Sequence, residues 1–163
     1  MNLSTPYHFR PGAIGALMDE YERVSLELRN LLSTISQEEF TKIFDHATTD
    51  EDCRSIQSVM KHVVRAGYGY ADQICVFLKK PVANNDYHVY NVVHAIEELE
   101  KVINFTADIV GDRLKMTEKE ILATRQETKW GLYDIEMMFE HAIVHILRHR
   151  RQIEKWLYSI SKS

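Results

Sequence analysis

The stretch from Glu140 to Trp156, EHAIVHILRHRRQIEKW, carries both the fold signal and the candidate chemistry of this chain. It contains no glycine or proline, and its apolar residues recur at steps of three and four, which is typical of an amphipathic helix. Histidine also recurs, at steps of four, as His141, His145 and His149. Because a four-residue step places helical side chains one above another, these imidazoles share one side of the helix.

The apolar stripe of this helix indicates which histidines point inward. At about 100° per residue from Ala142, His149 falls at about −20° and His145 at about −60°, on or beside the stripe. His141 falls at about −100°, on the shoulder, and we interpret it as exposed. The helix therefore directs His145 and His149 into the protein.

Three other long stretches show the same helical period. The predicted long helices cover approximately residues 14–35, 53–78, 89–109 and 130–160. Ser36 with Glu39, and Thr117 with Glu120, form capping boxes for two short helices between them. No stretch shows the alternation of a strand. The sequence predicts an all-α protein, a four-helix bundle with short extra helices in the connections, as one domain over residues 1–163.

The composition excludes several classes of protein. The 163 residues are 45% hydrophobic and 27% charged, with a formal charge of −4, as in an ordinary globular domain. The basic run at 148–151 is too short to indicate nucleic-acid or membrane binding. The two cysteines form no CxxC pair, and neither a signal peptide nor a membrane-length apolar run is present. We expect a cytoplasmic protein with no nucleic-acid or membrane partner.

A third inward histidine lies in the predicted second helix. His62 sits among Val59, Val63 and Tyr70, on or beside a buried stripe. Facing helices of a bundle can share one ion, and neutral imidazole suits transition metals such as zinc, nickel, iron or copper. Alternatively, each histidine is a core residue bonded to a carbonyl or hydroxyl group. The residues alone leave both interpretations open, although no Glu-x-x-His pair of a ferritin-like di-iron site is present.

Other candidate residues are interpreted as structural. Asp134 and Gln152 fall near −80° on the last helix, at about the rim of the histidine site, and we assign both to the surface. His94 lies opposite the apolar side of its helix and is expected to be solvated. The remaining candidates are assigned to packing or to inert helical positions: Cys53, Cys75, Tyr68, Tyr70 and Trp130.

Two segments together resemble a known family. The segment SIQSVMKHVVRAGYGYADQI around His62, followed far downstream by HILRHRRQI, resembles the DinB/YfiT-like family of small metal-binding four-helix bundles. That family has a histidine in its second helix and a final-helix motif HxxxHRGQ. The resemblance implies three metal ligands, and it aligns two further residues with the family's Arg and Gln. The ligands are His62, His145 and His149; the aligned residues are Arg150 and Gln152. Arg151 stands where glycine is common, and its angle of about 180° predicts a solvated side chain.

The resemblance also implies a reaction class. Family members include metal-dependent transferases that act with low-molecular-weight thiols, and they often pair. We therefore expect a metal-dependent enzyme with a divalent transition metal (zinc, nickel, iron or manganese), most directly a thiol-dependent S-transferase acting on a small-molecule substrate as a homodimer. The alternatives are a metal-dependent hydrolase, or a non-catalytic homodimeric bundle with structural histidines.

Overall fold

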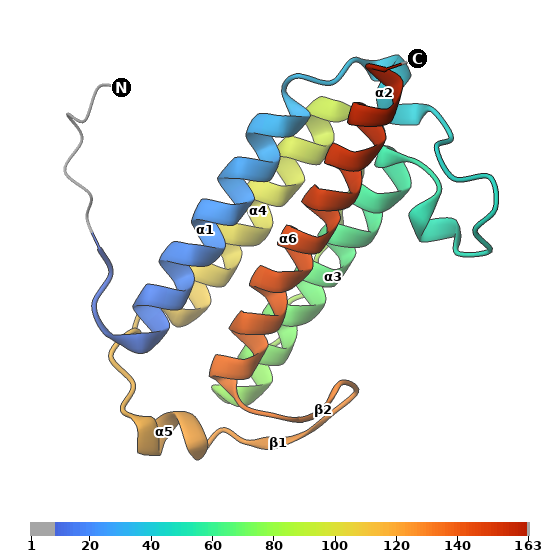
Figure 1. Cartoon of the computed structure of the whole chain (residues 1–163). Coiled ribbons are helices and arrows are strands. Elements are labelled where there is room, and N and C mark those ends of the chain that lie inside the picture. Colours follow the sequence, from blue (N-terminus) through green and yellow to red (C-terminus); the bar gives the residue numbers. More distant parts are fainter. Residues whose placement is uncertain (1–8, 163) are drawn as a thin grey trace.

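Four long helices form the bundle in the computed structural model, which describes residues 9–162 (Figure 1). The long helices are α1 (Gly12–Leu32), α3 (Ile56–Phe77), α4 (Val92–Val110) and α6 (Ile135–Ile160). The connections contain α2 (Gln37–Thr41), a 3-10 helix η1 (Glu51–Cys53), α5 (Glu118–Leu122) and two strands, β1 (Gln126–Thr128) and β2 (Gly131–Tyr133). The prediction of an all-α bundle with short helices in its connections is confirmed.

The long helices run as two parallel pairs. The α1 and α6 helices run in the same direction, and α3 and α4 run in the opposite one (Figure 1). Hydrogen bonds at both ends fix the second pair: Gln57 Nε2 donates to the carbonyl of Val89 at 3.2 Å, and Lys80 Nζ donates to that of Ile109 at 2.5 Å. The link between α3 and α4 must therefore return along the bundle. Because α3 packs antiparallel to α6, His62 near the start of α3 faces His149, and Tyr70 farther along α3 faces His141.

Serine and threonine caps set the starts of α2, α3 and α5. Both predicted capping boxes are present, with Ser36 capping α2 and Thr117 capping α5. A third box, Ser55 with Ser58, opens α3 at Ile56. The observed helix α3 is therefore shorter than the predicted range 53–78, because the Ser55 cap separates α3 from η1. At Gly67, an added Cβ would lie 2.6 Å from Val102 Cγ1, so α3 and α4 approach closely there.

The last helix starts later than the sequence predicted. Residues 126–133 form an antiparallel hairpin that includes residues 130–133, which were expected to be helical, and α6 begins at Ile135. Asp134 is its N-cap: one carboxylate oxygen accepts the Met137 backbone N–H at 3.1 Å, and the other accepts from Arg125 at 2.7 Å. Asp134 is only 3% exposed, so the expectation that it lies on the surface was wrong. Its chemistry as a cap and ion-pair partner explains the burial.

In the described part of the chain, no helix combines the length and the apolar character needed to cross a bilayer.

The Asp134 cap yields a prediction about stability. Replacing Asp134 with Ala removes the N-cap and leaves Arg125 without its partner, so we expect a loss of about 2–3 kcal/mol in the free energy of unfolding. Asp134→Asn keeps a capping oxygen but no charge, and should lose about 1 kcal/mol. Urea titration followed by circular dichroism measures both. An Asp134→Ala variant as stable as the wild type would contradict this role of the cap.

Candidate metal centre

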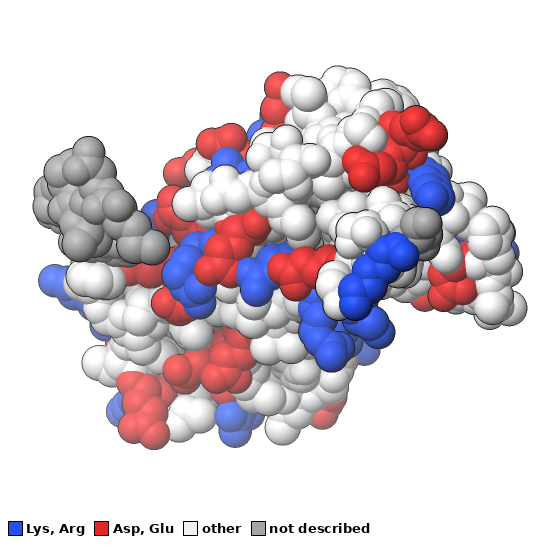
Figure 2. Space-filling model, turned by 45° about the horizontal axis from the view of Figure 1, so that its top comes forward, with Lys and Arg blue, Asp and Glu red and all other residues white. Residues whose placement is uncertain are grey.

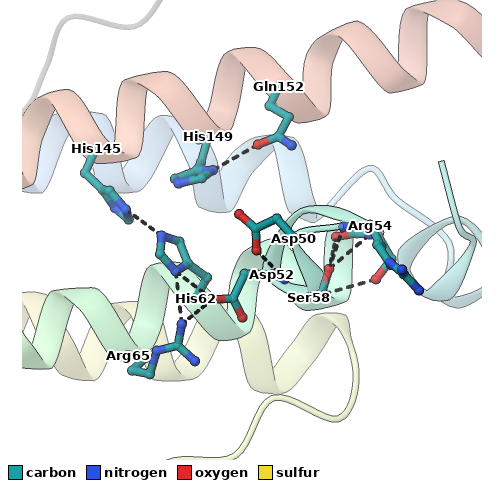
Figure 3. A network of polar contacts seen from close by, with 10 residues as sticks. Asp50, Asp52, Arg54, Ser58, His62, Arg65, His145, His149 and Gln152 are labelled. Carbon is teal, nitrogen blue, oxygen red and sulfur yellow. Dashed lines mark hydrogen bonds and ion pairs between the residues drawn. The ribbon is translucent and has the colours of Figure 1, made fainter. Parts of the chain in front are cut away.

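Three histidines from two helices meet in the seam between α3 and α6 (Figure 3). His62 points from α3 toward His145 and His149 on α6, and the Nε2 atoms of His62 and His145 are 2.9 Å apart. The three ring centroids lie 4.5–5.0 Å from one another. One nitrogen from each ring lies within 4.8 Å of the other two, so the group can hold a single metal ion. Nitrogens bound tetrahedrally to one zinc ion would be about 3.3 Å apart, a spacing that small side-chain shifts reach.

Burial holds the two α6 imidazoles in the neutral form that metals require. His145 and His149 are 8% and 7% exposed. Burial, followed by the neighbouring His149 and His62, lowers the pKa of His145 to about 3. Burial also lowers the pKa of His149, against an opposing effect of its hydrogen bond with Gln152. Neutral rings offer a lone pair at pH 7 without first losing a proton.

Outer hydrogen bonds orient two of the rings. Gln152 Oε1 lies 3.0 Å from His149 Nδ1, an arrangement in which the Nδ1–H donates and Nε2 faces the other histidines. Asp52 Oδ2 lies 3.3 Å from His62 Nδ1 and is itself held by Arg65 (Figure 3). Burial would raise the pKa of Asp52, but Arg65 and His62 outweigh it and the pKa is lowered. Asp52 therefore stays ionised and can accept the His62 Nδ1–H.

These outer partners were only partly foreseen. Gln152 is half-buried and contacts His149, so its assignment as a surface residue was wrong. Asp52 was missed altogether. It lies in η1, outside the regular spacing of any helix, so no period in the sequence connects it with His62.

His141 also differs from expectation. Its ring is half-buried, and its Nδ1 lies 3.1 Å from the Tyr133 hydroxyl on the hairpin. Tyr70 packs between the histidines, with its ring centroid 5.2 Å from that of His141 and 5.5 Å from that of His145. Trp130 completes this aromatic group at 5.4 Å from Tyr70. Burial, followed by the charge of Arg148, lowers the pKa of His141.

A hollow of about 260 Å³ opens on the protein surface beside His145. Its lining comes from the end of the hairpin and one side of α6: Tyr133, Met137, Glu140, His141, Val144, His145 and Arg148. Of the three clustered histidines, His145 alone lines this hollow. A small molecule in this hollow would contact His145 directly.

The remaining candidates stay outside this group. Cys75 is buried and Cys53 half-buried, and burial raises the pKa of each thiol, which agrees with inert cysteines. His94 is half-buried, with a buried Nδ1 that has no hydrogen-bond partner among residues 9–162, so the expectation of a solvated ring was only partly right. Arg151 is exposed, as predicted.

Arg150 pairs with Glu27 and thereby connects α6 with α1.

Comparison with known families agrees with this architecture. A model of the DinB family matches residues 12–159, from the start of α1 almost to the end of α6. The chain belongs to the DinB family. The match includes all three histidines of the cluster, and the resemblance noted from the sequence is confirmed at the level of the DinB family. A search of curated proteins found no match.

The cluster predicts which substitutions abolish metal uptake. We expect His62→Ala, His145→Ala and His149→Ala each to weaken zinc binding at least about 100-fold, because each removes one of three nitrogen donors. His141→Ala is the matched control and should keep near-stoichiometric metal. Elemental analysis and competition with a chromophoric chelator measure both quantities. Full metal content in any of the first three variants would show that the ligand set is wrong.

The pKa of His145 also predicts a pH dependence in the metal-free protein. An unfolded chain protonates this histidine near pH 6.5, whereas the folded chain does so near pH 3. The unfolded state therefore binds the extra proton between these values, and the free energy of unfolding should fall as the pH falls through that window, by about 1.4 kcal/mol per pH unit. His145→Phe should flatten this dependence between pH 6 and 4, as measured by urea unfolding. The exposed-histidine control His46→Phe should keep the wild-type slope; equal slopes in all three proteins would contradict the prediction.

Proposed function

We propose that His62, His145 and His149 bind one divalent transition metal, and that the protein is a metal-dependent S-transferase acting with a low-molecular-weight thiol on a small-molecule substrate. The observation that carries this proposal is the convergence of three imidazoles from two helices, the two on α6 buried with lowered pKa, beside a hollow open to solvent. Membership of the DinB family also supports this proposal.

The donor set fits such an ion. Three imidazole nitrogens suit zinc, nickel or iron, and three protein ligands leave a position for an exogenous group. A divalent metal held there supplies a Lewis acid, which stabilises a sulfur or oxygen anion near neutral pH. The protein's own task is to fix the rings, and Gln152 and the Arg65–Asp52 pair do so through the Nδ1 atoms of His149 and His62.

His141 is the proposed proton acceptor. It lines the hollow beside His145 and is kept neutral by burial and by the nearby charge of Arg148, which lower its pKa. In the tautomer whose Nδ1–H donates to the Tyr133 oxygen, its Nε2 is free to take a proton from an incoming thiol. The sulfur then attacks an electrophilic carbon, a C–S bond forms, the bond to the leaving group breaks, and the proton passes from His141 to solvent.

The hairpin and α3 shape the approach to this group. Tyr70, Trp130 and Tyr133 surround the ring of His141 with aromatic surface. These rings limit the water around the imidazole and offer apolar contact to the carbon skeleton of a substrate.

A two-arm assay separates transferase from hydrolase. Metal-loaded protein is incubated with 1-chloro-2,4-dinitrobenzene and a panel of thiols, and separately with a nitrophenyl ester without thiol. The proposal expects thiol-dependent release of chloride that is lost in the three ligand variants. Hydrolysis of the ester alone, with the same dependence on His62, His145 and His149, would favour the hydrolase alternative and overturn the transferase assignment.

His141→Phe tests the proton acceptor. We expect kcat to fall about 100-fold while the metal content is unchanged, because a ring of similar size that cannot take a proton replaces the imidazole. His46→Phe, on an exposed loop, should leave kcat unchanged. If the His141→Phe enzyme turns over like the wild type, His141 does not accept the proton.

A cytoplasmic location and a homodimer remain proposals as well; sedimentation analysis of the purified protein tests the second.

A further inference from the structure

Arg148 occupies the rim between two hollows on the same side of α6. On one side it lines the hollow that contains His141 and His145. On the other it lines a hollow of about 480 Å³, together with Arg151, Gln152, Lys155, Trp156 and Ser159. Figure 2 shows Lys and Arg side chains gathered near the C-terminal end of α6. A molecule that occupies the hollow beside His145 can therefore contact Arg148 as well.

The guanidinium of Arg148 makes no ion pair or hydrogen bond with any residue in the described range 9–162. Three other arginines near the site are paired: Arg65 with Asp52, Arg125 with Asp134, and Arg150 with Glu27. Arg151 is also without such a partner in the described range, but it does not line the hollow beside His145. Arg148 is exposed, so its five N–H donors remain available for a ligand.

The charge of Arg148 lies beside the histidine cluster, because Arg148 follows His145 by one turn of α6 and lines the same hollow as His141 and His145. A positive charge next to imidazoles that must stay neutral has no evident use in folding, because it makes no compensating contact. It does produce a positive potential at the mouth of the hollow, which attracts anions.

We infer that Arg148 binds a carboxylate of the small molecule that reacts at the three-histidine site, and so makes the enzyme selective for anionic thiols. This inference rests on the proposed function. A guanidinium matches a carboxylate with two parallel N–H···O bonds, which fixes both position and orientation. Glu140 lines the same hollow and repels an anion. The carboxylate would therefore lie at the Arg148 side, leaving the rest of the molecule beside His145.

A matched pair of thiols tests the inference without turnover. Zinc-loaded protein is titrated by calorimetry with 3-mercaptopropionate and with 3-mercapto-1-propanol, which differ in the carboxylate. The wild type should bind the anionic thiol about tenfold more tightly, and Arg148→Gln should bring the ratio of the two affinities close to one. Arg148→Lys keeps the positive charge but loses the planar guanidinium that can donate two parallel hydrogen bonds, and it should retain only part of the preference.

Arg151→Gln is the charge-matched control. It removes the same charge from the same helix, but Arg151 does not line the hollow that contains His141 and His145. We expect it to keep most of the preference for 3-mercaptopropionate. If Arg148→Gln and Arg151→Gln lose the preference equally, the general positive charge of this surface attracts the anion, and not a specific contact with Arg148. That result would overturn the inference.

The outcomes also separate the inference from the proposed function. If both thiols bind the wild type equally well, or if Arg148→Gln keeps the full preference, the anchor is refuted while thiol binding stands. If the zinc-loaded wild type binds neither thiol, the thiol-transferase proposal is refuted and the anchor with it.

Discussion

Three imidazoles packed against one another, two of them buried, impose the main constraint on this molecule. A proton on any one of them would repel its neighbours in a poorly solvated seam, and burial already lowers the pKa of His145 to about 3. Each ring therefore benefits from a partner that fixes its tautomer, and Gln152 and Asp52 provide this for His149 and His62. The antiparallel contact of α3 with α6 brings the three histidines together, so the site depends on how the helices of the bundle are arranged.

The bundle supplies the nitrogen donors, and the connections supply most of what surrounds them. Asp52 comes from η1, before α3, and reaches the outer side of His62. Tyr133 comes from the hairpin before α6 and contacts His141 at the other end of the row. The two irregular connections thus flank the seam. The N-cap Asp134, held by Arg125, fixes where the hairpin stops and α6 begins.

The sequence predicted the bundle because helical periods and capping boxes are local signals. The inward directions of His145 and His149 followed from helix geometry, and His62 followed from its apolar neighbours together with the family resemblance. The hairpin could not be predicted in this way, since its strands are three residues long and mostly exposed. Asp52, Tyr133 and the partner of Asp134 depend on tertiary contacts across connections, which no period in the sequence records. The prediction that His141 is exposed was wrong for the same reason. Helix angles describe the helix alone, and the hairpin that covers the ring lies outside it.

The nitrogen donors lie on the long helices, whereas much of what surrounds them lies on the connections. This separation affects how the selectivity of such a protein can change in evolution. Substitutions or insertions in the hairpin that carries Trp130 and Tyr133 would alter which molecules reach His145, while the nitrogen cluster itself stays on rigid helices. The proposed metal chemistry could then be directed to new compounds through variation in this connection, without rebuilding the helical scaffold.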